Sequence, residues 1–162
     1  MADRDGQGYA VILLTFVAAY VLAVIPLPVW LQWARPEWVA LTLIYWCIAL
    51  PQRVGIATGL VLGVGLDVLE GSIRGQNAFA LVVVALLSHM LYQRLRVYSL
   101  VQQAGVVFIL VGINQLICQW VQNLEGVSAL PRLFLLPAVA SALLWPVILL
   151  SLRGVRRRYQ VS

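Results

Sequence analysis

The chain alternates between long apolar runs and short polar breaks. Six apolar segments can be delimited, at about residues 9–26, 37–50, 54–69, 77–92, 101–121 and 133–152. A helix needs about 20 apolar residues to cross a bilayer, so the pattern predicts an all-α integral membrane protein built as a six-helix transmembrane bundle. No internal repeat or linker separates the segments, and we expect a single transmembrane domain over residues 1–162.

The second and third segments leave two topologies open. The run from Trp38 to Leu50 stops at Pro51, and the next run begins just after Arg53. Both runs are short for a full crossing. They could therefore form a shallow re-entrant pair, which would leave four full spans.

Composition supports the membrane assignment. Hydrophobic residues make up 62% of the chain and charged residues 10%, whereas a soluble domain carries about 25% charge. The mean hydropathy is +0.93. Six spans of about 20 residues would use most of the chain, so no room remains for a soluble catalytic domain.

All eleven basic residues are arginine, and they lie at the ends of the apolar segments. With six spans, one side of the membrane receives Arg4, Arg53, Arg94, Arg96, Arg153, Arg156, Arg157 and Arg158, and the other receives Arg35, Arg74 and Arg132. Cytoplasmic loops carry the excess of arginine, so both termini are predicted to be cytoplasmic. A re-entrant pair would move Arg53 to the outer side without moving the termini. The pattern favours contact with anionic lipid over nucleic acid.

The stretch from Arg35 to Gly75 holds the most specific features. Gly55, Gly59 and Gly63 repeat every four residues and would form one stripe on a helix. Small residues at this spacing let two helix backbones approach closely. The stripe therefore predicts either packing inside the bundle or the wall of a groove or subunit contact, which would also allow a homodimer.

Asp67 continues the same spacing, so we expect it on the glycine face, near the outer end of the third segment. An ionisable group in a span needs a partner or water and often marks a functional site. Arg35 and Arg74 are its nearest candidate partners. Two interpretations stay open, a structural ion pair and a site for a ligand or partner. Gly71 would permit a tight turn beside it.

The fifth segment carries a polar face. Its members recur at spacings of three and four residues and are Asn114, Gln115, Cys118, Gln119 and Gln122. Amide side chains in a bilayer form hydrogen bonds between helices. This face is predicted either to hold the bundle together or to contact another membrane protein.

No catalytic or metal-binding constellation is present in the sequence. An intramembrane aspartyl protease needs two carboxylates that share a proton, and no second aspartate accompanies Asp67 in another span. His89, Cys47 and Cys118 are isolated, whereas a metal site needs several ligands close together. We therefore expect that the protein is not an enzyme and that it binds neither a metal nor a cofactor.

Several short motifs resemble the signature of the MreD family, bacterial rod shape-determining membrane proteins, and in particular its gammaproteobacterial type. They are Arg35-Pro36-Glu37-Trp38, Tyr45-Trp46, Leu50-Pro51-Gln52-Arg53, Gly59, Gly63, Leu66-Asp67, Gly71 and Leu144-Trp145-Pro146. The resemblance implies a non-enzymatic component of the cell-wall elongation machinery in the bacterial inner membrane, with a role in cell shape and peptidoglycan synthesis.

The resemblance also implies partners and a fold. Proteins of this family associate with MreC directly, and through it with MreB, RodA and the partner transpeptidase of RodA. Their fold is similar to the S component of energy-coupling-factor transporters, which implies a pocket open to the periplasm. Residues 35–75, including Pro36, would form its wall.

Two functions follow from this sequence. In the first, the protein is a scaffold whose groove receives the membrane helix of MreC, while Arg35, Asp67 and Arg74 hold the outer helix ends in register. In the second, it is a small-solute-binding membrane transport component, which would retain a ligand and pair with an ATPase module.

Overall fold

The computed structural model describes residues 2–32, 34–71, 75–124, 126 and 134–161. These residues form helices and connecting turns, and no strand occurs among them. The helices are α1 (Ala2–Val24), α2 (Val29–Gln32), α3 (Trp38–Ala49), α4 (Ile56–Leu69), α5 (Gln76–Leu95), α6 (Leu100–Leu124) and α7 (Leu136–Arg158). The all-α prediction is confirmed.

The described part of the chain contains seven helices, whereas the apolar pattern predicted six. The additional helix is α2, which has four residues and follows Pro26 and Pro28. Proline lacks a backbone N–H and restricts the residue before it, so α1 ends ahead of Pro26 and the chain restarts as a short separate helix.

Within the residues that the structure describes, four helices are long and apolar enough to cross a membrane. They are Gly6–Val24 within α1 and the whole of α5, α6 and α7, with 19, 20, 25 and 23 residues. At about 1.5 Å per residue each reaches about 30 Å or close to it. Helices α3 and α4 have 12 and 14 residues, so neither reaches that length alone.

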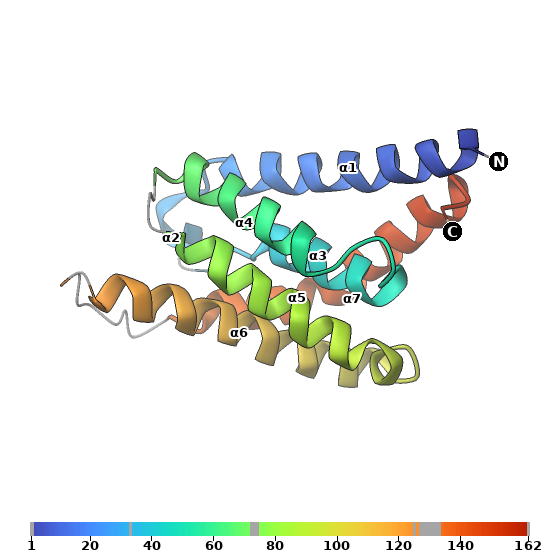
Figure 1. The fold of residues 1–162 in the computed structure, drawn as a ribbon. Coiled ribbons are helices and arrows are strands. Elements are labelled where there is room, and N and C mark those ends of the chain that lie inside the picture. Colours follow the sequence, from blue (N-terminus) through green and yellow to red (C-terminus); the bar gives the residue numbers. More distant parts are fainter. Residues whose placement is uncertain (1, 33, 72–74, 125, 127–133, 162) are drawn as a thin grey trace.

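The helices run back and forth between two ends, and both termini lie at the same end (Figure 1). We call that end the arginine end, because Arg53, Arg96, Arg153 and Arg156 gather there. The opposite end, which carries Glu37, Asp67 and Glu70, is called the acidic end.

Helix α3 forms the centre of the core. Each of its residues from Val39 to Ala49 is buried, and it contacts α1, α5, α6 and α7. A helix that is apolar on all sides is expected to be enclosed by others. The hydrophobic sequence of α3 therefore places it in the middle of the bundle.

Two buried tryptophans form hydrogen bonds between particular pairs of helices around this core. Trp46 of α3 donates its ring N–H to the Thr15 hydroxyl of α1 at 2.8 Å. Trp145 of α7 donates to the Gln103 side chain of α6 at 3.1 Å. A buried indole N–H needs an acceptor, so each bond specifies which helix packs beside its tryptophan.

The short pair α3–α4 extends over the same distance as the long helix α5. At the arginine end, the Arg96 side chain, directly after α5, donates to the Ile48 and Ala49 carbonyls at the end of α3. At the acidic end, Asp67 of α4 accepts hydrogen bonds from the first turn of α5. The turn between α3 and α4 therefore lies level with the end of α5.

Candidate functional site

Asp67 closes the start of α5. Its side chain is only 5% exposed, and its two carboxylate oxygens accept the backbone N–H groups of Asn77 and Ala78, both at 3.1 Å. The first N–H groups of a helix have no partner within the helix, and a negative charge is favourable there. Asp67 thus serves as a cap for a neighbouring helix, supplied from α4.

The backbone directly before α5 has a left-handed conformation at a glycine. Gly75 precedes the helix with φ of +68°, in the left-handed region that glycine adopts without strain. This conformation starts α5 beside the end of α4. The backbone N–H groups of Asn77 and Ala78 consequently reach Asp67.

Asn77 links α4 and α6 to this cap. Its side-chain amide donates to Glu70 at 2.7 Å, and the Cys118 sulfur lies 3.6 Å from its side-chain oxygen. Asn77 is buried, so these contacts satisfy a polar group that would otherwise be costly inside the bundle.

Glu37 is the second acidic group of this end. Its backbone N–H donates to the Ser141 hydroxyl of α7 at 3.0 Å, and its carboxyl is hydrogen-bonded to Gln115 of α6. Glu37 precedes α3 and lies outside the four candidate spans. Burial, and then the neighbouring Glu70 carboxylate, raise its pKa to about 7, against the opposing effects of Arg35 and Gln115.

A cavity of about 240 Å³ lies beside Glu37. Its polar lining residues are Gln32, Arg35, Glu37 and Glu70, and the rest of its wall includes Pro36, Trp38, Leu66 and Pro137. The cavity therefore combines acidic, basic and amide groups at the edge of an apolar core.

Several buried polar atoms near this end have no hydrogen-bond partner among the described residues. They are Arg35 Nη2, Gln76 Oε1, Asn114 Oδ1 and Gln115 Oε1. Buried polar groups are normally hydrogen-bonded. These atoms could bind a small polar molecule, and they make the acidic end the candidate site for a ligand.

The glycine stripe packs mainly inside the bundle. A side chain at Gly59 would place Cβ 2.8 Å from the Leu81 carbonyl oxygen of α5, and one at Gly63 would place it 2.5 Å from the Asn77 carbonyl oxygen. Gly55 faces open space. The backbone of α5 therefore fills the space beside Gly59 and Gly63, so these glycines offer no surface to an external helix.

The remaining residues singled out by the sequence have separate places. Asn114 is buried, and Gln119 donates to Asn123 within α6 at 3.1 Å. Gly71 has φ of +68° and lies in the turn after α4. Arg74 lies outside the described residues.

Glu37, Glu70 and Ser141 are functional-site residues that no pattern in the sequence predicts. Glu37 and Ser141 are 104 residues apart, so no local spacing joins them. A charge directly ahead of an apolar helix was the available signal for Glu37.

Among the described residues, no group of three or more histidine, cysteine, aspartate or glutamate side chains could hold a metal ion. The acidic side chains of this end instead bind the start of a helix and side-chain amides. Fold and site together define a multi-pass helical membrane protein in which polar groups hold helices in register.

Comparison with known proteins identifies the family. The model of the rod shape-determining protein MreD matches residues 5–155. The rod shape-determining protein MreD of Haemophilus influenzae is 35% identical over 150 residues, which cover 93% of this chain and 93% of the relative. No solved structure matches the chain.

The chain belongs to the MreD family of rod shape-determining proteins. It is therefore a multi-pass, non-enzymatic membrane protein of the machinery that elongates rod-shaped cells. The resemblance drawn from the sequence motifs is confirmed.

Proposed function

We propose that the protein is an inner-membrane scaffold that binds the membrane helix of MreC and thereby helps to regulate peptidoglycan synthesis. The observation that supports this proposal is the match of the MreD family model to residues 5–155. MreB, RodA and the partner transpeptidase of RodA would be reached through MreC.

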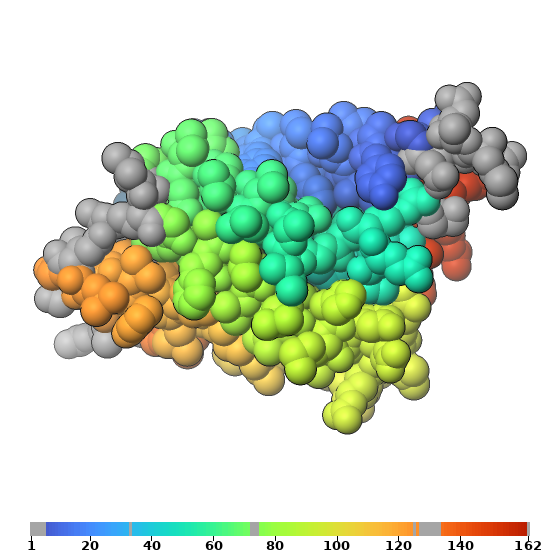
Figure 2. All heavy atoms as spheres, viewed as in Figure 1, coloured from blue at the N-terminus to red at the C-terminus, as the bar shows by residue number. Residues whose placement is uncertain are grey.

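The outward face of α4 is the surface that we assign to MreC. Of residues 35–75, α3 is enclosed on all sides, and Gly59 and Gly63 face α5. Helix α4 still exposes a continuous apolar stripe, consisting of Leu60, Val61, Val64 and Val68. Figure 2 shows α4 between α1 and α5 on one face of the molecule, where a transmembrane helix could lie alongside it.

The polar acidic end would support this surface indirectly. Asp67 binds the start of α5, and Tyr20 of α1 donates its hydroxyl to the Leu62 carbonyl of α4. These bonds hold α4 between its two neighbours. A rigid α4 presents its outward face without an ordering cost on binding.

The proposed topology places both termini in the cytoplasm, with α3 and α4 as two further crossings. The turn between them lies level with the end of α5, and arginines accumulate at that end. An excess of arginine is typical of cytoplasmic loops. Cysteine labelling of Gln52 in intact and permeabilised cells tests this arrangement, since labelling only after permeabilisation is expected.

A small-solute-binding transport component is the second candidate. The cavity of about 240 Å³ at the acidic end and the unpartnered polar atoms near it favour this function. A fold like that of transporter S components would fit it, although that likeness rests on the family resemblance alone.

Purification from native membranes in mild detergent separates the two functions. Co-purifying proteins and small molecules are quantified by mass spectrometry. Recovery of MreC at about one copy per chain, without a stoichiometric metabolite, is expected. Recovery of a metabolite or an ATPase module without MreC would contradict the scaffold and favour transport.

A further inference from the structure

Two adjoining hollows open at the arginine end. One has a volume of about 640 Å³ and is lined by residues that include Gln52, Arg53, His89 and Tyr92. The other has about 540 Å³ and is lined by residues that include Tyr98, Leu100, Leu149 and Arg153. Both share Ala49, Arg96 and Arg156, so we treat them as one site, the arginine hollow.

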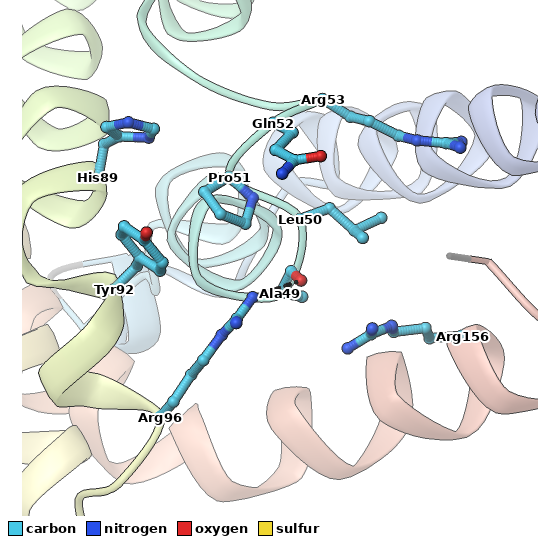
Figure 3. A pocket seen from close by; sticks show the side chains of 9 residues that line it. All are labelled: Ala49, Leu50, Pro51, Gln52, Arg53, His89, Tyr92, Arg96 and Arg156. Carbon is cyan, nitrogen blue, oxygen red and sulfur yellow. Dashed lines mark hydrogen bonds between the residues drawn. The ribbon is translucent and has the colours of Figure 1, made fainter.

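Arg96 and Arg156 are held in place by backbone carbonyls. Arg96 donates to Ile48 and Ala49, each at 3.0 Å, and Arg156 donates to Val161 at 3.2 Å. Figure 3 shows these two side chains reaching toward the end of α3, Arg96 from the segment directly after α5 and Arg156 from α7. A guanidinium has five N–H donors, so these bonds leave donors for a ligand.

The described residues that line the arginine hollow carry a net positive charge. Arg96, Arg153 and Arg156 are among them, and none of the described lining residues is an aspartate or glutamate. The carbonyls that hold Arg96 and Arg156 carry only partial charges. A ligand that fits this site must therefore be anionic, and planar guanidinium groups bind phosphate particularly well.

The position of the hollow favours a lipid as the source of that phosphate. Tyr92 lies in the last turn of α5 and Leu100 begins α6, and both helices are long enough to span the membrane. Tyrosines are typical of the membrane interface. The hollow also has apolar walls, formed by Leu95, Leu100 and Leu149, which suit the glycerol and first methylene groups of an acyl chain.

We propose that the arginine hollow binds the phosphate headgroup of an anionic membrane lipid, with Arg96 and Arg156 as the residues that hold the phosphate. Basic pockets between membrane helices bind such headgroups. This site lies at the opposite end from the cavity beside Glu37, and it is separate from the outward face of α4. The proposal therefore does not depend on binding of MreC.

The test uses the full-length protein in nanodiscs of phosphatidylcholine with increasing fractions of phosphatidylglycerol. Retained phosphatidylglycerol is counted by native mass spectrometry. Arg156→Gln is compared with Arg157→Gln, which removes the same charge from the neighbouring, exposed residue outside the hollow. We expect Arg156→Gln to weaken retention by about tenfold, the effect of one charge-assisted contact, and Arg157→Gln by less than about twofold.

Equal losses for both variants would overturn the proposal, because they would indicate attraction to surface charge alone. Unchanged retention in both would overturn it too. Arg156 also contacts Tyr45, so Gln52→Glu provides a variant that keeps every arginine. It places a negative charge in the hollow and should weaken retention about as strongly, whereas Gln93→Glu, outside the hollow, should not.

A second measurement separates lipid from soluble phosphate. The protein in pure phosphatidylcholine nanodiscs is titrated with inorganic phosphate, and binding is followed by calorimetry. Weak or undetectable binding supports the lipid assignment. Binding as tight as that of phosphatidylglycerol, lost in Arg156→Gln, would assign the hollow to a free anion and overturn the lipid assignment.

Discussion

At each end of the bundle a charged side chain caps a neighbouring helix, and the two charges have opposite signs. At the acidic end, Asp67 of α4 caps the start of α5. At the arginine end, Arg96, the residue after α5, caps the end of α3. In both places a charged side chain from another helix satisfies backbone groups that a helix leaves unpaired, with the sign that suits the helix dipole.

The surroundings of the two caps differ. Asp67 is buried, and Glu37, Glu70 and Arg35 bring charges of both signs to its end, around a cavity of about 240 Å³. Arg96 is exposed and borders larger hollows, and the described residues of their lining include no acidic one. The acidic side chains mainly make contacts within the fold, whereas the arginine end is where we propose that an anionic ligand binds.

The largest effect is expected from Gly63→Ala, next to the acidic cap. The added methyl group would collide with the Ala78 backbone and lie 2.5 Å from the Asn77 carbonyl oxygen, so α4 and α5 would have to separate. Overpacking against backbone should lower the free energy of unfolding by about 3 kcal/mol or more. Reversible unfolding in mixed micelles measures the loss.

Gly105→Ala in α6 is the matched control, because a side chain there meets open space. It should change stability by less than about 1 kcal/mol. Equal stabilities of the two variants would show that α4 and α5 are less closely packed than described.

Removal of the acidic cap should have the next largest effect. Asp67→Ala leaves two buried N–H groups without their acceptor and should cost about 2–4 kcal/mol. Asp67→Asn keeps one oxygen acceptor and should cost about half as much. The same unfolding measurement applies.

Glu70→Gln is the comparison for this loss, since Glu70 is exposed and its replacement can still accept from Asn77. Its cost should stay below about 1 kcal/mol. If Asp67→Ala were no more harmful than Glu70→Gln, the acidic end would not depend on its cap.

The stability of the protein should also depend on pH, because Glu37 at the acidic end titrates. In the folded protein the pKa of Glu37 is about 7, whereas the ordinary pKa of glutamate is 4.5. Glu37 therefore keeps its proton to a higher pH in the folded state than in the unfolded state. The contribution of the Glu37 proton to folding stability is therefore complete below pH 4.5 and is lost as the pH rises toward 7, which lowers the free energy of unfolding by about 3 kcal/mol.

Glu37→Gln should remove this dependence and leave the variant more stable than the parent above pH 7. Unfolding at several pH values checks both statements. A variant that keeps the full dependence would assign the titration to another group.

Arg96→Gln should have the smallest effect, because the arginine end is open. The carbonyls of Ile48 and Ala49 would lose a charged donor but could bind water, so the expected cost is about 1 kcal/mol. Arg94→Gln, at the exposed end of the same helix, should cost less than about 0.5 kcal/mol. Equal costs would indicate that Arg96 does not cap α3.

The sequence predicted the shared face of α4 well. Gly59, Gly63 and Asp67 recur every four residues, and all three face α5 in the structure. Helical periodicity is a local property, so spacing alone was sufficient. The acceptor role of Asp67 toward backbone N–H groups was missed, because the start of α5 and the turn at Gly75 decide which donors come within reach.

Contacts between distant segments could not be predicted in the same way. Glu37 bonds to Ser141 over 104 residues, and Arg96 bonds to Ile48 over 48 residues. The sequence indicates Arg96 only as a topology signal, and charge counting says nothing about the end of α3. Such pairs depend on how the helices are arranged.

Helix α4 connects the two ends of the bundle. The central claim is that the outward face of α4 binds MreC. A photo-crosslinking residue at Val61, 70% exposed on α4, is compared in living cells with one at Val147, 59% exposed on α7. We predict a crosslink to MreC from Val61 and little or none from Val147. A crosslink from Val147 alone would contradict the claim and place MreC on the other side of the bundle.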